Sequence, residues 1–162
     1  MNKILVVANW KMNASKSFIS NFIRDISANY NQENYHELLI CPPFPYLDQV
    51  SKELLKIDIQ IGAQNIAQFE NGAYTGEVSA EMLSDNGCKY VLVGHSERRT
   101  ILGEQDHIIS EKFNIAVKKN LVPILCIGET LDQKEKSLTE EIINSQITAI
   151  TEGIDLDEHS RF

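Results

Sequence analysis

Ile4-Leu5-Val6-Val7-Ala8-Asn9-Trp10-Lys11 is the stretch of sequence that decides the fold. Its first four residues form a short continuous apolar run, which is typical of a strand buried on both faces in a parallel sheet. An open, doubly wound sheet that binds a nucleotide carries a glycine-rich loop directly after such a strand. Here the run ends in Ala8-Asn9-Trp10-Lys11, which has no glycine. This ending favours a sheet closed into a barrel, with polar residues at the strand tips.

The alternation of a short apolar strand and an amphipathic helix continues along the chain. Apolar runs predict four further strands at residues 38–41, 57–61, 90–93 and 121–127. Helical spacing predicts helices at residues 18–26, 47–54, 80–85, 97–101, 109–116 and 138–150. A long loop at residues 64–79 separates the third strand from the helix that follows it.

Five strands alternating with helices predict right-handed crossovers and one parallel sheet. The fold class is therefore α/β, and we expect a TIM-type (β/α)8 barrel that the chain follows from its first strand to about its fifth helix. A closed barrel of this kind needs about 250 residues, whereas the chain has 162. We therefore expect residues 1–162 to form a single barrel domain that is incomplete at its C-terminus.

Composition and charge argue against several classes of function. The net charge is −8 with no basic run, so we expect no nucleic-acid partner. No apolar stretch approaches the ~20 residues of a membrane span, and the apolar run at residues 4–7 is too short for a signal peptide. Cys41, Cys88 and Cys126 form no metal-binding pattern. We expect a cytoplasmic protein with no metal site and no membrane partner.

Asn9 and Lys11 are the first candidate site residues. They lie two positions apart at the end of the first strand, so a period of two places both on one face and Trp10 on the other. If that face lines the barrel mouth, Lys11 can neutralise a phosphate or a developing oxyanion. The alternative is an ordinary solvated surface lysine.

His95 directly follows the predicted strand at residues 90–93 and Gly94, so it lies at a strand tip. Ser96 is a suitable N-cap for a short helix over residues 97–101. The positive end of that helix would disfavour an imidazolium and keep the ring neutral. A neutral imidazole can still donate a hydrogen bond to a substrate oxygen, which is the role of an electrophile. The alternative is a hydrogen-bonded structural histidine.

Glu97 has three interpretations: a catalytic carboxylate, an ion partner for Lys11, or an acid in the first helical turn. Arg98 and Arg99 are more typical of structural ion pairs than of ligand binding. Cys126, at the tip of the fifth strand, is more typical of a small buried apolar residue than of a catalytic thiol.

Together these segments resemble the triosephosphate isomerase family. The resemblance runs in order from Lys3 to about Ile150, and any one block alone would be weak. The residues that carry it are Asn9-Trp10-Lys11-Met12-Asn13, Gly62-Ala63-Gln64-Asn65, Gly72-Ala73-Tyr74-Thr75-Gly76-Glu77, Val93-Gly94-His95-Ser96-Glu97-Arg98-Arg99 and Cys126-Ile127-Gly128-Glu129.

The resemblance implies a role for each matching residue. Asn9 and Lys11 would bind substrate, and Glu97 would orient Lys11. His95 would be the neutral imidazole electrophile for which this family is a standard example. The loop at Thr75-Gly76-Glu77 would be the arm of a homodimer, with its tip beside the partner's active site. The family interconverts dihydroxyacetone phosphate and D-glyceraldehyde 3-phosphate, in glycolysis and gluconeogenesis, without a cofactor.

The chain also departs from the family pattern. The family's general base is a glutamate in a Glu-Pro segment after the sixth strand, and this sequence contains no Glu-Pro pair. It also lacks the family's later glycine-rich phosphate-binding turns, and Arg161-Phe162 resembles the opening of the sixth strand. We therefore expect an isomerase seen in part, inactive as 162 residues alone. The alternative is an inactive fragment or a non-catalytic dimerising module.

Overall fold

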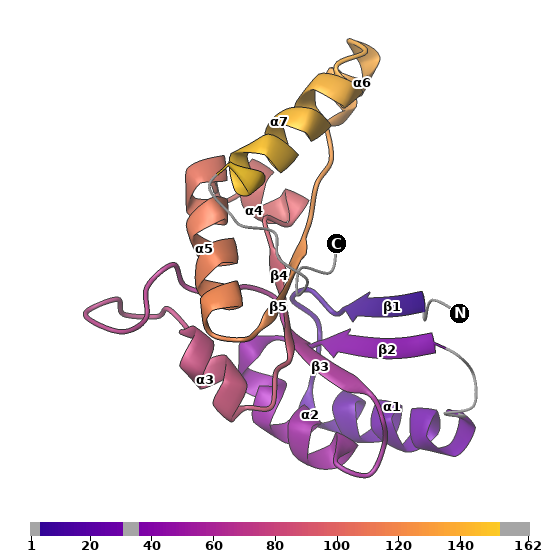
Figure 1. Cartoon of the computed structure of the whole chain (residues 1–162). Coiled ribbons are helices and arrows are strands. Elements are labelled where there is room, and N and C mark those ends of the chain that lie inside the picture. Colours follow the sequence, from indigo (N-terminus) through magenta and orange to yellow (C-terminus); the bar gives the residue numbers. More distant parts are fainter. Residues whose placement is uncertain (1–3, 31–35, 153–162) are drawn as a thin grey trace.

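Five parallel strands form the centre of the computed structural model, which describes residues 4–30 and 36–152 (Figure 1). They pair in chain order, β1-β2-β3-β4-β5. In Figure 1, β1 and β2 run across the view and β4 and β5 run along it, so the sheet turns steadily from one edge to the other. Strand order without a switch point is that of a (β/α)8 barrel, and this confirms the predicted fold class for these five units. The strands are β1 (Ile4–Asn9), β2 (His36–Cys41), β3 (Gln60–Ala63), β4 (Tyr90–Val93) and β5 (Val122–Leu125).

Helices connect the strands where the periodicity predicts them. Ser15 caps the first helix, since its Oγ accepts a hydrogen bond from the N–H of Phe18 at 3.1 Å. Asn120 follows the helix before β5 with a φ of 61°, the left-handed conformation that ends a helix. The helices are α1 (Lys16–Asn29), the 3-10 turn η1 (Phe44–Tyr46), α2 (Leu47–Leu54), α3 (Ala80–Asp85), α4 (Ser96–Thr100), α5 (Asp106–Lys118), α6 (Leu131–Glu135) and α7 (Thr139–Thr151).

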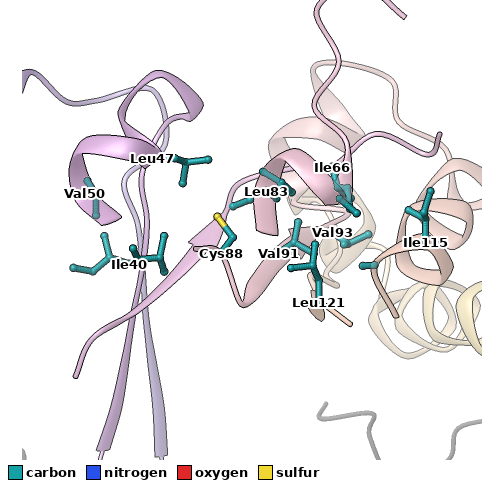
Figure 2. Close-up of a cluster of buried hydrophobic side chains, with 14 of the residues drawn as sticks. Ile40, Leu47, Val50, Ile66, Leu83, Cys88, Val91, Val93, Ile115 and Leu121 are labelled. Atoms are coloured by element: carbon teal, nitrogen blue, oxygen red, sulfur yellow. The ribbon is translucent and has the colours of Figure 1, made fainter. Parts of the chain in front are cut away.

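Alternate residues of each strand pack on opposite faces of the sheet. One face packs against the helices and forms the main core, which includes Ile40, Val91 and Val93 (Figure 2). The opposite face is the inner face, since it lies where a closed barrel has its interior. It carries a smaller buried cluster, the inner cluster: Leu39, Cys41, Tyr90 and Leu92, with Val122, Ile124 and Cys126 packed against them. Asn9, the last residue of β1, continues this inner face, because it lies beside Cys41 in the strand register.

Three strand predictions need correction. The third strand is Gln60–Ala63 and not residues 57–61, because Ile57 and Ile59 are still in turns that follow α2. The fifth strand is shorter than residues 121–127. The apolar side chains at the start of β1 are not buried: their exposed fractions are 59% for Ile4 and 48% for Val6. Among the described strands β1 pairs only with β2, which leaves its outer edge open.

Pro123 fits β5 because of its place in the ladder. The N–H groups of Val122 and Cys126 both donate to β4 side acceptors, at Lys89 O and Val93 O. N–H groups alternate in direction along a strand, so residues 122, 124 and 126 point theirs towards β4 and residue 123 faces the other side. The missing N–H of Pro123 therefore removes no hydrogen bond to β4.

Candidate active site

Polar side chains gather where β1, β3 and β4 end. Asn9 is the last residue of β1 and lies beside Cys41 of β2. Since Cys41 belongs to the inner cluster, Asn9 points to the same inner face. Trp10 points the opposite way and packs edge-on against Phe18 and Phe22 of α1, at 5.4 and 5.3 Å between ring centroids. The predicted division between Asn9 and Trp10 is confirmed.

Lys11 reaches the site by a turn and not by strand alternation. Its φ is 53°, a left-handed conformation that is uncommon for a residue with a side chain. Two amides hold this turn. The Oδ1 of Asn9 accepts the backbone N–H of Lys11 at 2.9 Å, and Gln64 Nε2 donates to the backbone O of Lys11 at 2.9 Å.

Gln64 is a site residue to which the sequence analysis assigned no role. Its Nε2 also donates to the backbone O of Cys41 at 2.8 Å, so one amide joins the ends of β1, β2 and β3. Its place directly after β3 is the signal that could have identified it, because polar residues at strand tips of a barrel are candidates for the site.

Lys11 and Glu97 form an ion pair at the mouth of the site. Lys11 Nζ lies 2.6 Å from Glu97 Oε1, although the two residues are 86 positions apart. Their side chains are about half exposed, at 51% and 46%. The hydrogen bond from Lys11, with its positive charge, lowers the pKa of the Glu97 carboxyl. Of the three interpretations of Glu97, the structure shows the ion partner of Lys11, placed in the first turn of α4.

His95 is the N-cap of α4, and Ser96 is already the first helical residue. This corrects the prediction of Ser96 as the cap. The reason is that His95 has a non-helical backbone, with φ −52° and ψ 141°, and its Nδ1 accepts the N–H of Glu97 at 3.3 Å. An imidazole nitrogen accepts a hydrogen bond through its lone pair, so this contact makes Nδ1 the acceptor of the ring. Nε2 is therefore left as a donor.

The side chains of Lys11 and His95 offer a ligand hydrogen-bond donors and a positive charge. Lys11 offers an ammonium and His95 offers an imidazole N–H. The carboxylate of Glu97 is held by Lys11, and its second oxygen lies 3.6 Å from Nδ1 of His95. Such a group can bind an anionic ligand and polarise a carbonyl oxygen.

A buried ion cluster supports the site from behind. Glu104 accepts from Arg98 Nε, with Oε2 at 3.1 Å, and pairs with Lys112. Lys112 Nζ also donates to Asn65 Oδ1 at 2.9 Å. Burial lowers the pKa of the Lys112 ammonium, and Glu104 opposes that shift. Since a buried charge that loses its partner is strongly destabilising, these contacts give Arg98 the structural role that its sequence context predicts.

The predicted arm residues Thr75, Gly76 and Glu77 do not join the Lys11 and His95 group. All three are exposed, in the 64–79 loop. This loop is fastened to α5 at its base, where Glu70 pairs with Lys118 and Lys119 at 2.6 and 2.7 Å. Hydrogen bonds from these two lysines lower the pKa of Glu70 to about 2. A hollow between this loop and α5 shares no residue with the His95 group.

The cysteines do not supply a reactive thiolate. Burial raises the pKa of Cys41 to about 12, with a smaller effect from Cys88 and Cys126. Burial also raises the pKa of Cys88 to about 12, and that of Cys126 in spite of the opposing charge of Arg99. Cys126 packs against the inner cluster, as its interpretation as a small apolar residue predicts.

Comparison with known proteins connects this geometry to a family. The family model described as triosephosphate isomerase matches residues 4–162. The chain belongs to the triosephosphate isomerase family.

Curated relatives agree with this membership. The triosephosphate isomerase of Nitrosococcus oceani is 43% identical over 152 residues, which are 94% of this chain and 61% of the relative. That of Rhodopirellula baltica is 42% identical over 153 residues, 94% of this chain and 60% of the relative. That of Methylococcus capsulatus is 40% identical over 162 residues, 99% of this chain and 64% of the relative. The chain thus spans about three fifths of the length of these triosephosphate isomerases.

Two further observations concern the described residues. Within 4–30 and 36–152, none of the helices combines the length and the apolar character needed to cross a membrane. The same ranges hold no group of three or more His, Cys, Asp or Glu side chains placed to bind a metal ion. The resemblance of Arg161-Phe162 to the opening of a sixth strand lies outside the described residues.

The ion pair gives a prediction for acid titration. In the wild type, the Glu97 carboxyl should titrate below the usual range of a glutamate, because Lys11 stabilises its charged form. Lys11→Met should raise that pKa towards the ordinary value. Carbon-13 NMR of the side-chain carboxyl as a function of pH measures both. Lys16→Met is the control, since Lys16 has no ion pair within the described part of the chain. An unchanged Glu97 titration in Lys11→Met would contradict the pairing.

Proposed function

We propose that the protein is a triose-phosphate isomerase, which interconverts dihydroxyacetone phosphate and D-glyceraldehyde 3-phosphate through an enediolate. The observation that carries the proposal is that Lys11 and His95, which come from distant segments, meet at Glu97 beyond the C-terminal ends of the strands. The chain in which they meet belongs to the triosephosphate isomerase family. No cofactor is needed, because the reaction moves a proton between adjacent carbons and leaves the overall oxidation state of the substrate unchanged.

His95 and Lys11 would stabilise negative charge on different parts of the substrate. The Nε2–H of His95 would donate to the carbonyl oxygen of the substrate and stabilise the negative charge that develops there. Donors placed in advance where charge develops are among the strongest sources of rate enhancement in enzymes. Lys11 would attract the phosphate and stabilise the enediolate, while Asn9 would bind substrate and support the turn at Lys11.

Glu97 would act on Lys11 and not as the base. Its Oε1 is held by the Lys11 ammonium at 2.6 Å, and the lowered pKa makes it a weak proton acceptor. A general base works best when its pKa lies near the working pH. We therefore assign the proton transfer to a residue outside these five units, the glutamate that the family carries after its sixth strand.

The exposed tip of the 64–79 loop supports self-association as a homodimer. Thr75, Gly76 and Glu77 are exposed at its tip, while Glu70 fixes its base. Large apolar side chains are also exposed on segments beyond the strand ends: Met12 at 95%, Met82 at 54%, Ile101 at 75% and Leu102 at 65%. On one continuous surface, such side chains would form the kind of apolar patch that marks a protein interface. The partner would be a second copy of the protein, in the cytoplasm, with no nucleic acid or membrane involved.

The proposed role of His95 predicts a separation of activity from stability. In the protein at its full natural length, His95→Gln should lower kcat by about 10²-fold or more, since a donor to the developing oxyanion is lost. Its melting temperature should change little. A coupled assay of triose phosphate turnover and thermal unfolding measure the two quantities. His107→Gln, on the exposed surface of α5, is the control and should retain activity. Equal losses of activity and stability would favour a structural histidine, and an inactive wild type would overturn the proposed function.

The proposed dimer predicts that the loop tip controls association. Thr75→Arg should shift the protein towards monomers, because a long charged side chain would have to be buried at the tip contact. Sedimentation velocity at several concentrations measures the change. Thr148→Arg, the same substitution on an exposed position of α7, should leave the dimer intact. A dimer of unchanged strength in Thr75→Arg would contradict the role of the loop.

A further inference from the structure

Arg99 connects the end of β4 to the start of α5, directly behind His95. Its Nε donates to the backbone O of Gly94 at 2.7 Å, and its Nη1 pairs with Asp106, the first residue of α5. The side chain is only 13% exposed. One guanidinium therefore holds a strand-tip carbonyl and a helix-start carboxylate at the same time.

The carbonyl that Arg99 holds belongs to the peptide that leads into His95. Gly94 is buried and has a φ of +72°, a conformation that suits glycine. A Cβ at this position would lie 3.0 Å from Arg99 Nη2 and 3.0 Å from Ile109 Cγ2. Arg99 and Ile109 thus enclose the turn, and the Gly94–His95 peptide has little freedom to rotate.

We propose that Arg99 is a positioning residue that sets the direction of the His95 imidazole; the catalytic meaning of this role rests on the proposed isomerase function. Holding the Gly94 carbonyl fixes the plane of the Gly94–His95 peptide and so the direction of the His95 N–Cα bond. The hydrogen bond from the Glu97 N–H to Nδ1 then fixes the rotation of the ring. Together the two contacts determine where Nε2–H points.

The chemistry of the guanidinium explains why an arginine serves this purpose. Its donors lie in a rigid planar fork, so Nε and Nη1 can bind two different acceptors in a set geometry, which an ammonium cannot reproduce. Within the described residues, Nη2 is buried and has no hydrogen-bond partner. An unpaired buried donor is unfavourable for stability. Arg99 therefore binds the Gly94 carbonyl and Asp106 although one of its own donors stays without a partner.

The test compares Arg99→Met with Arg98→Met in the protein at its full natural length. Arg98 is the matched control, because it is the adjacent arginine of α4 and pairs with Glu104, which keeps Lys112 as a partner when Arg98 is replaced. Within the described residues, no hydrogen bond joins the Arg98 side chain to Gly94. Long-range 1H–15N spectra of the imidazole report its tautomer. We expect the wild type and Arg98→Met to show His95 with its proton on Nε2. Arg99→Met should show a mixture of both tautomers and a kcat lowered by about 10- to 100-fold at similar KM.

A second variant and a wild-type measurement decide the case if Arg99→Met does not fold. Arg99→Lys keeps the charge beside Asp106 but loses the fork, so it should show the same tautomer mixture with a smaller loss of stability. In the wild type, the Nε–H of Arg99 should exchange slowly with water and show a scalar coupling to the Gly94 carbonyl carbon. Fast exchange with no coupling would overturn the proposal.

The spectra keep this proposal separate from the proposed function. They need no turnover, so an inactive wild type would overturn the isomerase and still leave the effect of Arg99 on His95 measurable. An active isomerase whose His95 spectrum and kcat are unchanged in folded Arg99→Met or Arg99→Lys would overturn the positioning role alone.

Discussion

The contact between Lys11 and Glu97 is the constraint on which the site depends. Lys11 follows β1 and Glu97 follows β4, and β2 and β3 lie between these strands. In a flat sheet, β1 and β4 would be roughly 14 Å apart, three strand spacings. Their charged atoms nevertheless lie 2.6 Å apart. The turning of the sheet brings both side chains over its inner face, and Gln64 fastens the intervening strand ends to Lys11.

The electrostatics of the site follow from this contact. Because Lys11 Nζ donates to Glu97 Oε1, the carboxylate holds the ammonium in place and the pKa of the carboxyl is lowered. The backbone of Glu97 makes a second contact, since its N–H donates to Nδ1 of His95. One residue thus orients the cation with its side chain and the imidazole with its main chain. The resulting group can bind an anion and polarise a carbonyl.

Much of the fold was predictable because the apolar pattern is strongly periodic. The helices α2 and α3 have the predicted bounds, and Ser15 caps α1 as a serine at that position should. The prediction for β3 was wrong because the apolar residues Ile57 and Ile59 alternate like a strand although they form turns. The prediction of a buried β1 was wrong because an apolar run does not show that other elements pack against the strand. Among the described strands, β1 has a neighbour on one side only.

The site was predictable in its residues and less so in its geometry. Asn9, Lys11, His95 and Glu97 were identified as polar residues near strand tips, and their functional roles stay predictions. The left-handed backbone of Lys11 was not predictable, since it depends on Gln64, 53 positions away. The capping role of His95 was missed because serine is the commoner cap. Here the imidazole Nδ1 reaches the N–H two residues on and takes that place.

Zero-length carbodiimide cross-linking, read by peptide mass spectrometry, tests most directly whether the sheet brings the ends of β1 and β4 together. Both side chains of the Lys11–Glu97 pair are about half exposed, so the reagent can reach them. The account predicts an amide bond between Lys11 and Glu97 in the folded protein. The pair of Lys118 and Glu70, also 2.6 Å apart, provides the internal reference. Recovery of the Lys118–Glu70 link without a Lys11–Glu97 link would contradict the account.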